Sequence, residues 1–262
     1  MATTSIKYTV SARGKKAFVP IWSFLDRHFI DIPRNQIESV FGFAEKCTLY
    51  GGRPATLRQL SDRDIHSLNA AGIGFRIPVT NHFFNMQEYE KCRPFFEKYH
   101  KKGNALIILN DKLADIIRHD FPRYKREGSM IKNIKTHKQI DDALQLFDTV
   151  VLPMEMNDNI QFLEKVGPKH RITLFATGGC AYTCPARTCY RRVSWINKFL
   201  AADNKLKNIA GYLLYPFSRG CSRRKFKRAL LGSVRFDIRR FQEIGYSSFK
   251  VIRSNPFTRT CH

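Results

Sequence analysis

The sequence has no apolar run long enough to cross a bilayer. A transmembrane helix needs about 18 or more consecutive apolar residues, and no stretch of the 262 residues reaches that length. Residues 1–18, MATTSIKYTVSARGKKAF, also lack the apolar core of a secretory signal. We therefore expect a cytoplasmic protein that does not associate with membranes.

Signature motifs of several common enzyme classes are absent too. The chain has no H-E-x-x-H pattern, no G-x-S-x-G turn and no P-loop, and its histidines show no metal-ligand spacing. An early glycine-rich dinucleotide fingerprint is also missing. These absences argue against a zinc peptidase, a serine hydrolase, a P-loop nucleotidase and a dinucleotide-binding oxidoreductase.

Acidic residues are scarce. The chain has 22 Asp and Glu against 45 Lys and Arg, which gives a formal net charge of +23. The imbalance is concentrated in residues 187–259, which hold eighteen Lys and Arg and three acids. This charge predicts a polyanionic partner, most simply RNA or DNA phosphate. A solvated basic surface, an anionic small substrate and anionic lipid are the alternatives.

Short apolar runs alternate with amphipathic stretches along the chain. The pattern predicts strands at 46–52, 74–81, 104–110, 129–134, 149–155, 171–179 and 247–255. It predicts helices at 61–72, 85–103, 111–122, 136–147, 157–167, 194–204 and 235–245. Pro94 is expected to kink or split the second helix, and a less regular basic loop is expected between the last two.

This alternation predicts an α/β fold, a (β/α)8 TIM-type barrel formed as one domain over residues 1–262. An irregular or incomplete C-terminal part is left open. Active sites of such barrels lie at the carboxyl ends of the strands. A basic, cysteine-containing segment at 178–240 follows directly from the strand at 171–179, so we expect it on the catalytic face.

Three cysteines, Cys180, Cys184 and Cys189, lie within ten positions of that segment. In a cytosolic chain such a group is more often metal-binding or catalytic than a disulfide framework. Four thiolates can hold a 4Fe–4S cluster or a zinc ion, and Cys221 in the next long loop is the natural fourth ligand. A 4Fe–4S cluster is our first interpretation, cysteines without metal are the second, and zinc is the third.

Polar residues at other strand ends are further candidates. Arg53 follows two glycines that would let the backbone approach a ligand, and it can grip a carboxylate or phosphate or pair with an aspartate. Asn81 either lines the site or caps a helix. Glu155 is either a general base or substrate anchor, or one half of a salt bridge. Cys47 and Cys92 have apolar neighbours, which predicts packed thiols rather than ligands.

The run from residue 215 to 240 mixes cations with Tyr and Phe. That composition is typical of a single-stranded nucleic-acid surface, although the aromatic residues alone are more typical of a core. The cations expected to hold phosphates are Arg187, Arg191, Arg192, Arg223, Arg224, Lys225, Lys227 and Arg228. The first three have a second interpretation, because they would offset the negative charge of a four-thiolate cluster.

Four sequence elements, in this order, resemble the collagenase-like U-32 peptidase family. LYGGRPATLRQL (49–60) is similar to its early glycine–arginine turn, and LNAAGIGFRIPVTN (68–81) to a helix-end glycine and strand of the family. GGCAYTCPAR (178–187) is similar to its C-x3-CP-x-R element, and VRFDIRRFQEIGYSSFKVIRSNP (234–256) to its late helix and strand. The family consists of barrel proteins, and several relatives are iron–sulfur proteins of oxygen-independent hydroxylation.

The resemblance implies an enzyme that hydroxylates RNA, or another aromatic substrate, without oxygen. It points to Cys180, Cys184 and Cys221 as cluster ligands more firmly than to Cys189. It also implies a homodimer or a heterodimer with a related barrel protein. The expected pocket residues are Arg53, Asn81 and Glu155, from their places at strand ends, and Arg253, which ends the closing strand and matches the family's terminal arginine. The competing hypothesis is a non-catalytic barrel that binds nucleic acid or joins an assembly.

Overall fold

Parallel strands close into a barrel in the computed structural model, which describes residues 5–179, 182, 189–218 and 234–252. Each strand pairs with the next in chain order, and β8 pairs with β1 to close the circle. The strands are β1 (Lys7–Ser11), β2 (Ile37–Phe41), β3 (Gly74–Val79), β4 (Ala105–Ile108), β5 (Lys125–Gly128), β6 (Thr149–Val151), β7 (Ile172–Phe175) and β8 (Ser248–Val251). The eight-stranded parallel closure confirms the predicted TIM-type barrel.

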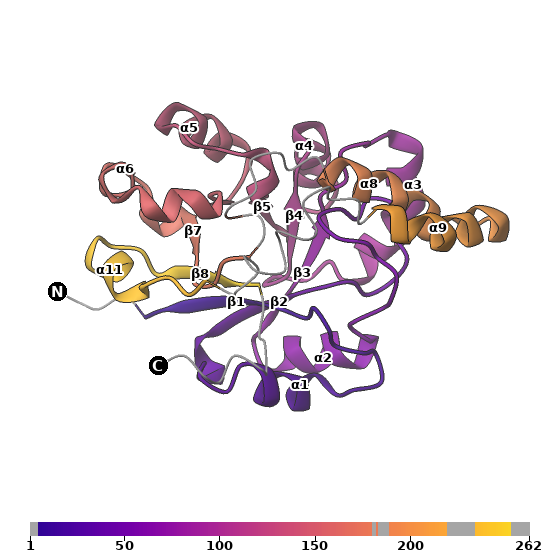
Figure 1. The fold of residues 1–262 in the computed structure, drawn as a ribbon, viewed down its shortest axis with the longest axis horizontal. Coiled ribbons are helices and arrows are strands. Elements are labelled where there is room, and N and C mark those ends of the chain that lie inside the picture. Colours follow the sequence, from indigo (N-terminus) through magenta and orange to yellow (C-terminus); the bar gives the residue numbers. More distant parts are fainter. Residues whose placement is uncertain (1–4, 180–181, 183–188, 219–233, 253–262) are drawn as a thin grey trace.

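Helices connect the strands and surround the barrel (Figure 1). They are α1 (Ile21–His28), α2 (Asp62–Ala70), α3 (Met86–Lys98), α4 (Asp111–Asp120), α5 (His137–Leu146), α6 (Ile160–Glu164), α8 (Cys189–Leu200), α9 (Lys205–Ser218) and α11 (Ile238–Glu243). Short 3₁₀ turns are η1 (Arg34–Gln36), η2 (Met130–Lys132), η3 (Met154–Asp158) and η4 (Lys169–Arg171). Within the described ranges, no helix combines the length and apolar character needed to span a membrane.

Local side-chain caps fix where several helices begin. Ser61 and Thr136 each form a capping box, with Asp64 and Gln139 as the reciprocal partners. Asn110 accepts a hydrogen bond from the backbone of the first turn of α4. These contacts satisfy backbone N–H groups that have no partner within the helix, which is why the sequence signals located the starts of these helices correctly.

Two expected strands are wrong. Residues 46–52 form turns and loop rather than a strand, although Cys47, Leu49 and Tyr50 are buried. The apolar run there signals burial, and the strand of this unit is the earlier β2. Residues 129–134 contain η2, and the strand before them, β5, has the charged sequence KREG. Glu127 of β5 points into the barrel, and Arg126, on the opposite face of the strand, pairs with Asp148, so hydrophobicity could not reveal this strand.

The region after β7 also differs from expectation. α8 begins at Cys189 rather than at 194, and α9 replaces part of the expected basic loop. A Cβ added at Gly211 would lie 2.8 Å from the backbone nitrogen of Leu200, so this glycine lets α9 pack closely on α8. α9 extends away from the barrel at the right of Figure 1. α3 continues through Pro94 as one helix.

The hydrophobic core lies between the strands and the surrounding helices. In β3 the side chains of Phe75 and Ile77 join this core, as do those of Leu106 and Ile108 in β4, and they pack with helix residues such as Phe96. Alternate residues of a strand point to opposite faces. The residues between them therefore face the barrel interior.

Charged side chains fill part of that interior. Arg76 on β3 and Lys250 on β8 both pair with Glu127 on β5, and the Lys250 Nζ to Glu127 Oε1 distance is 2.7 Å. These strands are not neighbours in the barrel, so their side chains meet across its interior. Arg76 also donates to Ser39 at 2.6 Å and pairs with the half-buried Glu38 at 2.5 Å. Burial and the nearby Arg76 lower the pKa of Lys250 well below its usual value.

Glu127→Gln is expected to lower the free energy of unfolding by about 3–5 kcal/mol, because two buried cations lose their shared acid. Lys250→Met should lower the free energy of unfolding by less, since Arg76 still pairs with Glu127. Chemical denaturation measures both changes. The control is Asp26→Asn in the exposed Asp26–Arg34 pair, which should cost at most about 1 kcal/mol. Equal losses for Glu127→Gln and Asp26→Asn would contradict the structural role of the network.

Candidate functional site at the carboxyl end of the barrel

Two tyrosines from the region after β7, Tyr182 and Tyr190, pack at the carboxyl end of the barrel. Val151 and Phe175, the last residues of β6 and β7, are buried in a small apolar cluster that also includes Tyr182 and Tyr190. These two tyrosines lie before and after residues 183–188. The Tyr182 hydroxyl donates to Asp158, on the turn that follows β6, at 2.6 Å. Tyr182 and Tyr190 therefore lie on the face where barrel active sites lie.

Of the four predicted cysteine ligands, Cys189 is the one that lies in the described part of the chain. Its surroundings suit a thiolate. It is half-buried at the first residue of α8, where the helix dipole favours negative charge. Arg191 and Arg192, in the same turn, are exposed. Within the described ranges no three His, Cys, Asp or Glu side chains converge as a metal site. The other predicted ligands, Cys180, Cys184 and Cys221, lie outside those ranges.

Arg53 is half-buried near the carboxyl end of β2. Its Nη2 donates to Gln59 Oε1 at 2.7 Å, and its guanidinium lies 4.7 Å from the ring centre of Phe43. Burial and the nearby Arg13 lower the pKa of Arg53 to about 9, so the group remains charged at neutral pH. Within the described part of the chain no carboxylate pairs with Arg53. A desolvated cation with this environment can hold a carboxylate or phosphate group.

The glycines before Arg53 serve the protein's own packing. A Cβ on Gly51 would lie 2.1 Å from the backbone oxygen of Thr80, so only glycine fits where this loop crosses the end of β3. Gly52 has a φ of +75°, which favours glycine as well. The expected close approach is therefore to the neighbouring loop, and it fixes the position of Arg53.

Asn197 on α8, which the sequence did not single out, holds the loop around Arg53 by hydrogen bonds. The Asn197 side chain is fully buried; it donates to the backbone oxygens of Tyr50 and Arg53 at 3.0 Å each and accepts from the backbone of Ala55 at 2.9 Å. Ser194, one turn earlier, is also buried and lies 3.0 Å from His82 Nδ1. Two polar residues three apart on the apolar face of a helix were the available signal.

Asn81 and Glu155 lie at strand ends as expected, but each has structural partners. The buried Asn81 amide donates to the backbone oxygens of Thr48, Tyr50 and Ser194, and its oxygen accepts from the backbone of Phe83. Asn81 thus joins two loops to α8.

Glu155, in η3 after β6, forms a 2.8 Å ion pair with Lys135. The salt-bridge interpretation of this residue is therefore realised, and its catalytic role stays a prediction. Arg53, Asn81 and Glu155 share the carboxyl face, but each contacts different partners. The remaining predicted residues lie outside the described ranges: Arg187, Arg223, Arg224, Lys225, Lys227, Arg228 and Arg253.

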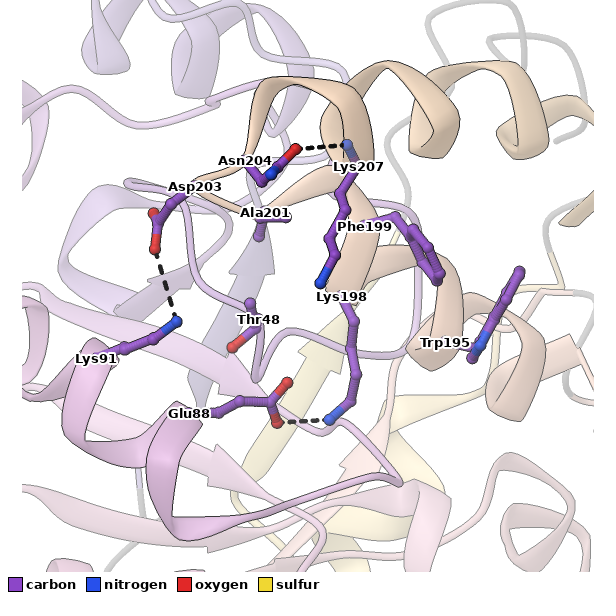
Figure 2. A pocket seen from close by; sticks show the side chains of 11 residues that line it. Thr48, Glu88, Lys91, Trp195, Lys198, Phe199, Ala201, Asp203, Asn204 and Lys207 are labelled. Atoms are coloured by element: carbon purple, nitrogen blue, oxygen red, sulfur yellow. Dashed lines mark hydrogen bonds and ion pairs between the residues drawn. The ribbon is translucent and has the colours of Figure 1, made fainter.

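A pocket of about 470 Å³ lies between α3 and the α8–α9 pair (Figure 2). Glu88 pairs with Lys198 across it at 2.5 Å. The rings of Trp195 and Phe199 lie 4.6 Å apart on one wall, and Trp195 is 46% exposed. Lys207 extends into the pocket in Figure 2, and the described residues give its ammonium group no acidic partner. The pocket thus offers aromatic surface beside a cation.

The comparisons with known proteins agree with the barrel class. The solved structure of the U32 peptidase Mk0906 matches with a TM-score of 0.56 and 10% identity over 97% of this chain and 95% of that chain. At this identity the likeness shows a U32-like barrel fold and nothing of the chemistry. No family model and no curated protein matches the sequence.

Asn197→Asp should lower the free energy of unfolding by about 2–4 kcal/mol. The carboxylate cannot donate, so the backbone oxygen of Arg53 loses its bond from Asn197 and that of Tyr50 keeps only its bond from Asn81. Denaturant unfolding measures the loss, and limited proteolysis should show faster cleavage at 50–57.

The matched control for this change is Asn85→Asp. It keeps an accepting cap at the exposed start of α3 and should stay within about 0.5 kcal/mol of the parent. If both variants are equally stable, Asn197 does not hold the Arg53 loop.

Proposed function

We propose that this protein is an enzyme that modifies RNA by oxygen-independent hydroxylation at the carboxyl end of a U32-like barrel. The observation that carries the proposal is the packing of Tyr182 and Tyr190, which flank residues 183–188, on the apolar carboxyl end of β6 and β7. The charged Arg53 lies at the same face. The ligands proposed for a 4Fe–4S cluster are Cys180, Cys184, Cys189 and Cys221.

The chemistry sets requirements that these groups can meet. Converting C–H to C–OH without O₂ takes the oxygen atom from water and passes two electrons and two protons to an acceptor, here an electron-transfer protein. A 4Fe–4S cluster bound to the cysteines would supply one-electron transfer. Arg53 would hold an anionic group of the substrate, and the apolar cluster around Phe175 would exclude bulk water.

The α8–α9 pair provides a surface suited to RNA. Arg191 and Arg192 are exposed on the first turn of α8, and Trp195 is exposed one turn later. Lys207 lines the same pocket as Trp195 and Phe199 (Figure 2). Cations that track phosphates beside rings that stack bases are typical of single-stranded nucleic-acid binding. The net charge of +23 also favours binding to the phosphates of RNA.

The second candidate is a non-catalytic barrel that binds RNA or joins an assembly through its basic surface. This candidate is favoured because two of the expected pocket residues have structural partners: Asn81 is hydrogen-bonded to backbone groups, and Glu155 is paired with Lys135. In this case the cysteines hold zinc or no metal. The iron and sulfide analysis below separates the candidates, and the RNA-binding experiment tests the surface that both would use.

Protein purified without oxygen should contain about four iron and four sulfide per chain. Cys184→Ser should lose most of both, because a serine oxygen is a poor replacement for a thiolate ligand. The matched control is Cys261→Ser, which alters a cysteine outside the proposed ligand set and should keep the iron. An iron-free parent protein refutes the cluster, and about one zinc per chain would support the second candidate.

Trp195→Ala should weaken binding of single-stranded RNA by about 5- to 150-fold, the effect of losing one base–aromatic contact. Lys207→Ala should weaken binding and lower the slope of log affinity against log salt by about 0.7. Fluorescence anisotropy between 50 and 200 mM salt measures both. Phe18→Ala, an 80% exposed aromatic outside α8 and α9, is the control. If Trp195→Ala and Lys207→Ala bind RNA as tightly as the control Phe18→Ala, α8 and α9 do not form the RNA-binding surface.

A further inference from the structure

Cys47 and Cys92 form a close sulfur pair. Cys47 lies in the loop after β2 and Cys92 lies on α3, and their Sγ atoms are 3.1 Å apart. Both are buried, with 2% and 5% of their surface exposed. The prediction of packed thiols therefore describes their burial, but it missed that the two pack on each other. An approach of about 1 Å would bring the sulfurs to disulfide bonding distance.

The two thiols differ in their surroundings. The hydrogen bond from Cys47 lowers the pKa of Cys92, and the hydroxyl and backbone of Thr48 act in the same direction. Burial raises the pKa of Cys47 well above its usual value. Cys92 is thus favoured as the attacking thiolate, and Cys47 as the thiol that reacts second.

The pair lies near the pocket between α3 and α8–α9. Thr48 and Lys91 line this pocket (Figure 2). The Thr48 hydroxyl oxygen lies 4.0 Å from Cys92 Sγ, and Cys92 directly follows Lys91 in the chain. The pocket is thus the route by which an oxidant would reach Cys92.

We propose that Cys47 and Cys92 are an oxidation site at which a hydroperoxide forms an intramolecular disulfide. The Cys92 thiolate attacks the peroxide, the O–O bond breaks, and Cys92 becomes a sulfenic acid while the first water leaves. Cys47 then attacks that sulfur, loses its proton, and releases the second water. Two thiols and one hydrogen peroxide give one disulfide and two waters, and the two electrons lost by sulfur reduce the peroxide.

The disulfide would tie the loop at 47–50 to α3. This loop carries Tyr50, whose backbone oxygen is bound by Asn81 and Asn197, and it leads to Arg53. The bond would close a loop of 45 residues. It would therefore reduce the freedom of the unfolded chain and hold the Arg53 loop more rigidly.

The test treats the reduced full-length protein with hydrogen peroxide, blocks remaining thiols with N-ethylmaleimide and maps the peptides by mass spectrometry. The expected product is a linked Cys47–Cys92 peptide that disappears with dithiothreitol. Oxidation should also raise the melting temperature by roughly 5–10 °C, reversibly.

Cys47→Ser and Cys92→Ser should each abolish the linked peptide and the reversible rise, and Cys261→Ser should keep both. If a core variant does not fold, the peptide map of the parent protein decides alone. Labelling of both Cys47 and Cys92 by N-ethylmaleimide after peroxide, or links from either to another cysteine, overturns the proposal.

Discussion

Glu127 accepts both Arg76 and Lys250 inside the barrel, and the arrangement of the strands depends on this shared acid. The three residues come from strands that are not neighbours, so their contacts fix the barrel across its interior. Two buried cations beside one buried acid are tolerated because Arg76 also reaches Ser39 and Glu38. The outer faces of the same strands are free to form an apolar core with the helices.

The candidate site is built on that rigid base by contacts between distant parts of the chain. Asn197 on α8 binds the backbone around Arg53, and Asn81 binds the backbone of α8. The apolar carboxyl ends of β6 and β7 receive Tyr182 and Tyr190 from the segment that holds the proposed ligands. Arg53 and the two tyrosines that flank residues 183–188 are thus brought to one face of the barrel by buried polar contacts and aromatic packing.

Much of the fold was predictable because it rests on local patterns. Alternating apolar and amphipathic runs predicted the barrel, and capping residues such as Ser61 and Thr136 located helix starts. β5 escaped prediction because three of its four residues are charged, and the buried run around Cys47 resembled a strand in its apolar pattern. The expected position of the cysteine segment at the carboxyl face is consistent with the packing of Tyr182 and Tyr190. Its ligand set stays a prediction.

The sequence alone determined the barrel class, the strong positive charge and the cysteine segment after β7, since these follow from composition, periodicity and order along the chain. Only the tertiary structure decided what the individual polar groups do. In the folded protein Asn81 donates to backbone carbonyls and Glu155 forms an ion pair with Lys135. Arg53 lies beside aromatic rings, and the sulfur of Cys47 contacts that of Cys92. Such partners lie tens of residues apart, and their contacts arise only when the barrel closes and the helices pack against it.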